Sequence, residues 1–245
     1  MNPLPPIGDA DALARTRLAW HTLAEHVLAA ARYRATGRIG LRATPGGFGT
    51  PPYDIDGEPE ELQVVGRDLL IQRSGATITV PLTTVGHAAS AVGISPGAPA
   101  DVYQPTTTLD PDAPLDIDAD AALALGAWFD VTWAALEELR ASAPEQDAAA
   151  AVQLWPEHFD AATELGNKGR GTRGTFGASP GDEPHPMPYL YVTHWADVGD
   201  DTYWNDTSFP GASLRYEALR RSDDAMATAL AFYREGRARL NGPSG

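Results

Sequence analysis

The 245-residue chain is 43% hydrophobic and 21% charged, a composition that predicts a folded protein with a sizeable core. It contains no cysteine, which excludes disulfides, thiolate metal ligands and a cysteine nucleophile, and which is typical of a reducing, cytoplasmic compartment. With 18 Lys and Arg against 33 Asp and Glu, the formal net charge is −15, so nucleic acids and anionic membranes are disfavoured as partners.

The N-terminal region is expected to begin with a flexible, Pro-rich tail at residues 1–8. It has neither the basic nor the apolar segment of a signal peptide, and no apolar run in the chain approaches the ~18 residues that cross a bilayer. A helix is expected from a cap at Asp9 or Asp11 to about Arg34, because apolar residues recur there at helical spacing. Gly37 should end it.

A compact β-meander is expected after this helix, because short alternating segments are separated by the turn signals Gly66-Arg67 and Ser74-Gly75. The expected elements are a strand at 38–43, a loop at 44–53, strands at 61–65, 68–72 and 76–80, and a helix from Thr83 or Thr84 to Val92.

Residues 93–116 are rich in Pro, Asp and Thr and predict an irregular connector that could act as a hinge. Beyond it we expect a helix from Asp118 or Asp120 to about Ala143 and a strand at 151–160 that could continue to Leu165. A Gly-rich stretch at 166–181, a strand at 188–195 and a loop at 196–211 should follow. The last element is a helical region at 213–240 that is broken near Ser222, and Ser222 could cap the last helix.

The order helix, β-meander, helix therefore occurs twice. This order predicts an α+β fold in which two similarly ordered helix–β-meander–helix halves form one domain with antiparallel sheet. The single domain is expected to span residues 9–245, with pseudo-halves at 9–95 and 117–241 and the connector at 96–116.

Several motifs in the second half resemble those of a bacterial family of uncharacterised proteins, one of the domains of unknown function. The matching segments are Trp155–Asp160 (WPEHFD), Phe176–Asp182 with its SPGD turn, Pro188–Val192 (PYLYV), Gly211–Leu219 and Leu230–Tyr233. The resemblance covers about half of the chain and implies one domain, a similar layout and an intracellular location. It transfers no catalytic residue, because the family has no established activity.

The polar segment from Glu157 to Asp160 gives the first candidate site. On a strand, His158 and Asp160 share one face, where they could act as an oriented general base or as two metal ligands. Alternatively, they hydrogen-bond to each other or to a turn and fix a hairpin. Further metal ligands would have to come from Glu164, Asp182 and His194. Because no recognised ligand spacing is present, no metal and no cofactor are predicted.

An aromatic strand gives the second candidate. Tyr189 and Tyr191 share a face and could line an apolar or sugar-stacking pocket, or could simply pack against helices. We expect a cleft between the 155–160 strand, the 179–182 turn and the 189–194 strand. The residues assigned to ligand binding in it are Trp155, Asp182, Tyr189, Tyr191 and His194.

The glycine-rich loop from Asn167 to Thr175 gives the third candidate, because Lys168, Arg170 and Arg173 concentrate positive charge there. Backbone amides that point together beside Arg170 and Arg173 could bind a phosphate or carboxylate. A mobile hairpin tip explains the same residues. The loop matches neither a P-loop nor a dinucleotide-binding fingerprint.

Two other features have mainly structural interpretations. The segment from Thr44 to Gly49 could place Phe48 in a pocket, but a tight loop over the core explains it as well. His21 and Glu25 lie one helical turn apart, and such a pair is usually solvated.

The residues favour a small-molecule-binding protein or an enzyme that uses the cleft near the 155–160 strand. A non-catalytic interaction or structural protein is the alternative, and a metalloprotein is a weaker one. No nucleophile elbow of the G-x-S-x-G type is present. Homo-oligomerisation stays open.

Overall fold

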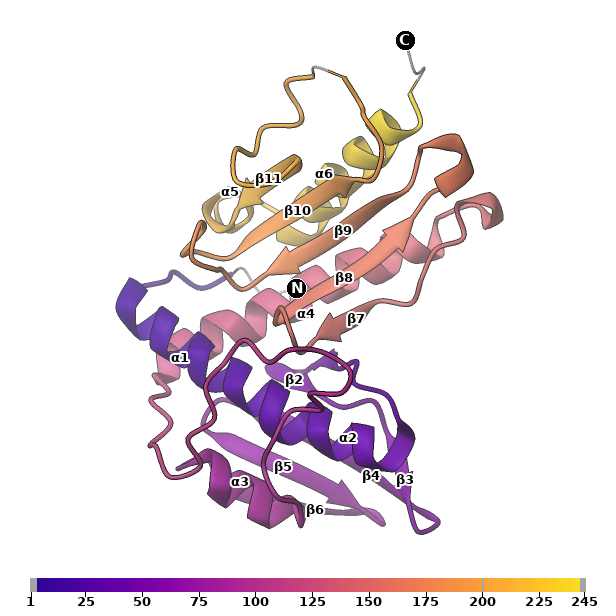
Figure 1. The fold of residues 1–245 in the computed structure, drawn as a ribbon. Coiled ribbons are helices and arrows are strands. Elements are labelled where there is room, and N and C mark those ends of the chain that lie inside the picture. Colours follow the sequence, from indigo (N-terminus) through magenta and orange to yellow (C-terminus); the bar gives the residue numbers. More distant parts are fainter. Residues whose placement is uncertain (1–3, 200, 243–245) are drawn as a thin grey trace. The chain divides into compact units, whose positions relative to one another are not determined.

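The computed structural model describes residues 4–199 and 201–242, and its helices and two antiparallel sheets confirm the α+β class (Figure 1). The chain divides into two compact units. The N-terminal unit comprises residues 6–130 and 154–159, and the C-terminal unit comprises the described residues among 1–5, 131–153 and 160–245. The division falls within the helix α4 (Ala119–Ala141), not in the connector. None of the described helices is both long and apolar enough to cross a membrane.

The N-terminal unit begins with a continuous helical stretch made of α1 (Ala10–Leu23), the π-helical segment η1 (Ala24–Leu28) and α2 (Ala29–Thr36). As predicted, the Asp9 side chain caps it by accepting from the Asp11 amide, and Gly37 ends it with a φ of 70°. The π-helical turn was not predicted, and all five of its residues are buried.

The sheet of this unit confirms the predicted three-strand meander and adds short strands to it. Its strands are β1 (Arg42–Thr44), β2 (Gly47–Gly49), β3 (Tyr53–Ile55), β4 (Glu58–Val65), β5 (Asp68–Arg73) and β6 (Ala76–Pro81), in the order β1-β2-β4-β5-β6 with β3 also on β4. The predicted loop at 44–53 is therefore wrong. A Cβ at Gly47 would lie 1.9 Å from the Val64 carbonyl oxygen, so glycine allows β2 to approach β4.

Four aromatic rings make the centre of the N-terminal core. Phe48 is fully buried, and its ring centroid lies 5.6 Å from that of Trp20, 6.4 Å from that of Phe129 and 5.1 Å from that of Phe159. Phe48 therefore fills the core. After β6, α3 (Val85–Val92) begins at its predicted cap Thr84, and the connector that follows has no helix or strand of its own.

The C-terminal unit contains a second antiparallel sheet and the last helices. After α4 come η2 (Glu145–Asp147), β7 (Gln153–Trp155), β8 (Asp160–Leu165), η3 (Lys168–Arg170), β9 (Gly174–Ser179), β10 (Tyr189–His194), β11 (Gly211–Arg215), α5 (Tyr216–Arg220) and α6 (Ala225–Leu240). The strand order is β11-β10-β9-β8-β7. The strand β11 was not predicted, and the cap of α6 is Asp224 instead of Ser222.

The predicted continuous strand at 151–160 is wrong. A turn at residues 156–159 separates β7 from β8, and Phe159 in it has a φ of 53°. Pro156 has no N–H to donate to a ladder, and burial of the Phe159 ring offsets the left-handed backbone, which is unfavourable for a bulky residue.

The start of the chain is packed where the structure describes it. Leu4 is buried, and the Tyr216 hydroxyl donates to the Pro5 carbonyl at 2.6 Å within the C-terminal unit. Of the tail that was expected at residues 1–8, residues 4 and 5 are thus anchored. Residues 1–3, like residues 243–245 of the expected domain, lie outside the described residues.

Candidate functional site: a buried polar cluster at the π-helical turn

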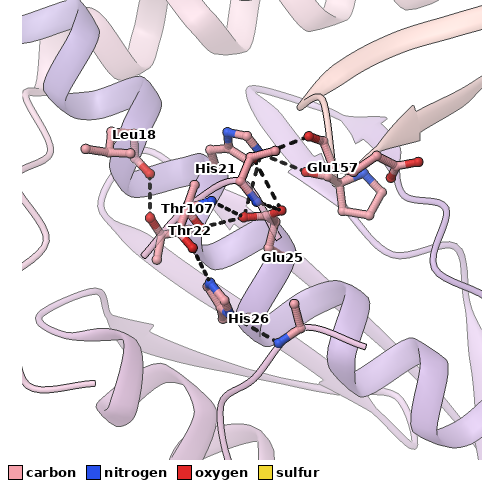
Figure 2. A network of polar contacts seen from close by, with 10 residues as sticks. Leu18, His21, Thr22, Glu25, His26, Thr107 and Glu157 are labelled. Carbon is pink, nitrogen blue, oxygen red and sulfur yellow. Dashed lines mark hydrogen bonds and ion pairs between the residues drawn. The ribbon is translucent and has the colours of Figure 1, made fainter. Parts of the chain in front are cut away.

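Glu25 lies in a network of polar contacts in the N-terminal unit (Figure 2). Its side chain is inaccessible to solvent. Its Oε1 accepts from the Thr106 amide at 2.9 Å, and its Oε2 accepts from the Thr107 amide at 2.8 Å and the Thr107 hydroxyl at 2.5 Å. The expectation of a solvated His21–Glu25 pair is therefore wrong for the carboxylate. Glu25 instead binds the connector to the helix.

The π-helical turn explains why a polar pair lies inside. It inserts an extra residue into the helix and shifts the faces that follow, so Glu25 and His26 both point inward. Turns of this kind occur frequently at functional sites. A π-helical turn is difficult to predict from a single sequence, because the residues Ala24–Leu28 suit an ordinary α-helix equally well.

His26 extends the cluster along the connector. Its Nδ1 accepts from the Ala98 amide at 3.0 Å, and its Nε2 lies 3.3 Å from the Thr107 carbonyl oxygen. An amide can only donate and a carbonyl can only accept, so His26 is neutral with its proton on Nε2. Both ring nitrogens are thereby used to position the connector.

His21 faces the turn that follows β7. Its Nε2 lies 2.8 Å from the Pro156 carbonyl oxygen and 3.3 Å from the Thr106 hydroxyl, and its ring stacks on Phe159 at 5.2 Å. Burial lowers the pKa of His21, and the Glu25 carboxylate, 3.9 Å away, opposes this effect only in part. His21 is therefore neutral near pH 7, with Nε2 donating and Nδ1 free to act as an acceptor.

Two polar atoms beside this network are buried without a hydrogen-bond partner in the described chain, namely the Tyr103 hydroxyl and the Glu157 Oε2. Burial raises the pKa of Tyr103, and the carboxylates of Glu25 and Glu157 raise it further, so the phenol stays protonated. An unsatisfied buried donor or acceptor costs about 1–3 kcal/mol. A hydrogen-bond partner at either atom would remove the cost of that atom.

A hollow of about 470 Å³ lies beside the cluster, between α1 and residues 106–116 of the connector. Leu18 and Leu115 give it apolar walls, while Thr22, Thr106 and Thr107 give it hydroxyl groups. The amide and hydroxyl of Thr107 bind Glu25, so the buried carboxylate fixes one wall of the hollow.

The structure places two of the predicted site residues in this unit. His158 is exposed in the 156–159 turn, and Trp155 is half-buried at the end of β7. Because His158 is not on a strand, the predicted sharing of a strand face with Asp160 is wrong. Its neighbour Glu157 contributes its backbone carbonyl to the cluster by accepting from the Thr106 hydroxyl at 3.3 Å.

Four other predicted residues come together in the C-terminal unit. The Tyr191 hydroxyl donates to the buried carboxylate of Asp160, and the Tyr189 hydroxyl donates to Asp182 at 2.6 Å. Burial and these carboxylates raise the pKa of both phenols. His194 lies on the opposite face of β10, where its Nδ1 donates to the Ala196 carbonyl at 2.7 Å.

Sequence reasoning missed His185, which belongs to the same group. Its ring centroid lies 4.4 Å from that of Tyr189, and its Nε2 lies 2.9 Å from a carboxylate oxygen of Asp206. The available signal is its spacing from Asp182, because the Asp182 side chain accepts from the His185 amide at 2.8 Å. Each phenol and imidazole of this group is therefore paired with a carboxylate of the chain itself.

The ion pair between His185 and Asp206 predicts that the stability of the fold depends on pH. Burial opposes ionisation, but hydrogen bonds from Ser213 and Ser208 and the charge of His185 outweigh it and lower the pKa of Asp206 to about 2. A lowered folded-state pKa stabilises the fold above the unfolded value of ~3.9 and loses that contribution as the pH falls towards 2. Asp206→Asn should therefore cost about 1–2 kcal/mol at pH 6 and progressively less below pH ~4.

Urea unfolding at several pH values measures this difference. The exposed Asp223, replaced by Asn, is the matched control and should show no such pH dependence. An Asp206→Asn penalty that stayed constant from pH 6 to pH 3 would contradict the assignment.

Two of the three basic side chains in the loop from Asn167 to Thr175 contact other residues of the C-terminal unit. Arg173 donates to Glu164 at 2.8 Å and to the Gly166 carbonyl at 3.0 Å, and its guanidinium lies 5.4 Å from the ring centroid of Trp195. Lys168 lies over the same ring at 5.9 Å. The side chain of Arg170 is exposed and forms no ion pair with the described residues. Arg173 is thus unavailable to a ligand without breaking these contacts.

The described residues contain no group of three or more His, Asp or Glu side chains that could hold a metal ion. In comparisons with known proteins, no family model, no curated protein and no solved structure matches the chain. The resemblance to a family of uncharacterised bacterial proteins therefore stays a prediction.

Proposed function

We propose that the protein binds a small amphipathic molecule in the hollow between α1 and residues 106–116. The observation that carries the proposal is this hollow of about 470 Å³, whose threonine wall is fixed by the buried carboxylate of Glu25. Its volume lies within the range of small-molecule sites. His21, whose pKa is lowered by burial, lies 3.3 Å from the hydroxyl of Thr106 in the wall, and shifted pKa values are common at functional sites.

The walls favour a ligand with an apolar body and a short polar head. Leu18 is 58% exposed at the rim although it is a large apolar residue, so a hydrocarbon group would cover it favourably. The hydroxyls of Thr22 and Thr107 already donate to the Leu18 carbonyl and to Glu25, so they would accept a hydrogen bond from the head. The residues that line the hollow include two carboxylates, Asp110 and Asp116, and one cation, Arg15. Because the net charge of the chain is also −15, a neutral or cationic head is favoured over an anionic one.

Three probes that share one hydrocarbon body test this proposal, namely isohexyl alcohol, isohexylamine and isohexanoate. Amide NMR spectra at millimolar probe should show shifts at Thr22, Thr106 and Thr107 with the amine and the alcohol, and weaker shifts with the carboxylate. Leu18→Glu should abolish the shifts, because it places a charge where the apolar body would lie.

The matched control is Leu123→Glu, since Leu123 is also an exposed leucine on a helix of the same unit, with 63% exposure, and it does not line the hollow. This variant should bind the probes as the natural protein does. If no probe shifts these amides, or if Leu18→Glu binds as well as Leu123→Glu does, the proposal is wrong.

A further inference from the structure

The outer edge of the N-terminal sheet is unusually bare. The strand β6 (Ala76–Pro81) ends the strand order of this sheet (Figure 1). Each of its residues is exposed except the half-buried Val80. Natural proteins generally protect such an edge with charges, bulges or a covering segment, because its free backbone groups can pair with another strand. Apart from Pro81 at its end, β6 has no proline and no charged side chain, and none of the described residues pairs with its outer edge.

The stretch of chain that contains this edge is unusually poor in charged residues, although Asp68 and Arg73 of β5 lie opposite the two ends of β6. Residues 74–100, which include β6 and α3, contain no Asp, Glu, Lys or Arg, although 21% of the chain is charged. The cores of protein interfaces are depleted of charged residues in the same way. On a chain of net charge −15, a second copy that approaches this segment meets no carboxylate of the segment itself.

The hydrogen bonding of β6 shows which of its backbone N–H and C=O groups do not face β5. The Leu82 amide donates to the Arg67 carbonyl at 2.8 Å, and the register pairs Ile71 with Ile78. Backbone groups of an antiparallel strand alternate in direction, so the even-numbered residues of β6 face β5. The N–H and C=O groups of Thr77 and Thr79 therefore point to the open edge.

The side chains of β6 add an apolar contribution at the same place. Ile78 lies opposite Ile71, which is buried, and therefore projects from the core face of the sheet, yet it is 58% exposed. The apolar face of the sheet thus continues to the free edge without a cover.

From these observations we propose that two copies of the chain associate through β6, in antiparallel register with Ile78 opposite Ile78 of the other copy. Thr77 of each copy then donates to and accepts from Thr79 of the other. The two Ile78 side chains meet on one face, with Cβ atoms about 4.5–5.5 Å apart, and both are withdrawn from water. A two-fold arrangement of this kind closes after two copies.

Cross-linking tests the register, and the cysteine-free chain makes single-cysteine variants unambiguous. Under mild oxidation, Ile78→Cys should form a disulfide-linked dimer efficiently, because like residues face each other there. Thr77→Cys should link poorly, since Thr77 faces Thr79. Equal yields from Ile78→Cys, Thr77→Cys and the off-strand control Thr83→Cys would overturn the proposal.

The oligomeric state tests the association without cross-links. Sedimentation from low to several hundred micromolar protein should show the mass rising from 26.0 kDa towards twice that value. Thr79→Pro should keep the protein monomeric, because it removes an edge N–H but no bond to β5. Ile78→Lys should do the same, whereas the exposed-leucine control Leu123→Lys should still dimerise.

Amide NMR spectra establish that each variant is folded before its mass is measured. A natural protein that stays monomeric over the whole concentration range would overturn the proposal, and so would a dimer that survives both Thr79→Pro and Ile78→Lys.

Discussion

Glu25→Ala is expected to destabilise the protein by about 3–5 kcal/mol, which is a large fraction of the stability of a typical domain. The carboxylate accepts from the amides of Thr106 and Thr107 and from the Thr107 hydroxyl, all inside the protein. Alanine would leave these donors without a partner and without water. Hydrogen bonds to a charged group contribute about 1.5–3 kcal/mol each, so the loss of several outweighs the relief of burying a charge.

Urea unfolding measures the total effect, and hydrogen exchange locates it. The amides of Thr106 and Thr107 should lose their protection in Glu25→Ala, whereas amides in β4 and β5 should report only the global change. Glu58→Ala is the control, because Glu58 is an exposed glutamate of the same unit and should change stability by no more than about 0.5 kcal/mol. A loss below 1 kcal/mol with unchanged exchange at both threonines would contradict the role given to Glu25.

Gly126→Ala is expected to destabilise the protein by about 2–4 kcal/mol, although alanine is the better helix former. Gly126 lies in α4, and a Cβ there would be 2.4 Å from the Gly46 carbonyl oxygen and 2.6 Å from the carbonyl carbon. The turn that contains Gly46 is held in place, because its amide donates to Asp130 at 3.2 Å. Helix propensity alone would give a gain of about 1 kcal/mol, so the sign of the change shows which effect dominates.

The control for this prediction is Ala127→Gly, one residue further along the same helix. It changes helix propensity in the opposite direction without a close approach, and should cost about 1 kcal/mol. Thermal and urea unfolding of both variants are sufficient. A Gly126→Ala variant as stable as the natural protein would mean that the turn at Gly46 moves away at little cost.

Local signals predicted much of the secondary structure. The caps at Asp9 and Thr84, the C-terminal Gly37 and the turn at Ser74-Gly75 act within a few residues of where they stand in the chain, so they can be read from the sequence. The strand β2 could not be predicted in this way. Its glycines are unfavourable in strands, and only the close approach to β4 explains them.

The polar cluster around Glu25 could not be predicted from the sequence for a different reason. Glu25 and Thr106 are 81 residues apart, and a π-helical turn directs the carboxylate towards the connector. The pairing of Tyr191 with Asp160 is also distant in sequence. Alternation along β10 puts Tyr189 and Tyr191 on one face, as expected, but the expected strand at 151–160 is interrupted before Asp160, so its partner could not be predicted. Composition gave no indication that the carboxylates would be paired internally.

The aromatic core of the N-terminal unit also bears on how the protein is made. Phe129 and Phe159, which pack against Phe48, follow it by a long stretch of chain. A ribosome adds about 5–20 residues each second, so residues 6–116 leave it several seconds before Phe159 does. A nascent chain stopped at the connector lacks both rings and should be sensitive to protease, and protection should appear only in nascent chains long enough to expose the 154–159 turn outside the exit tunnel.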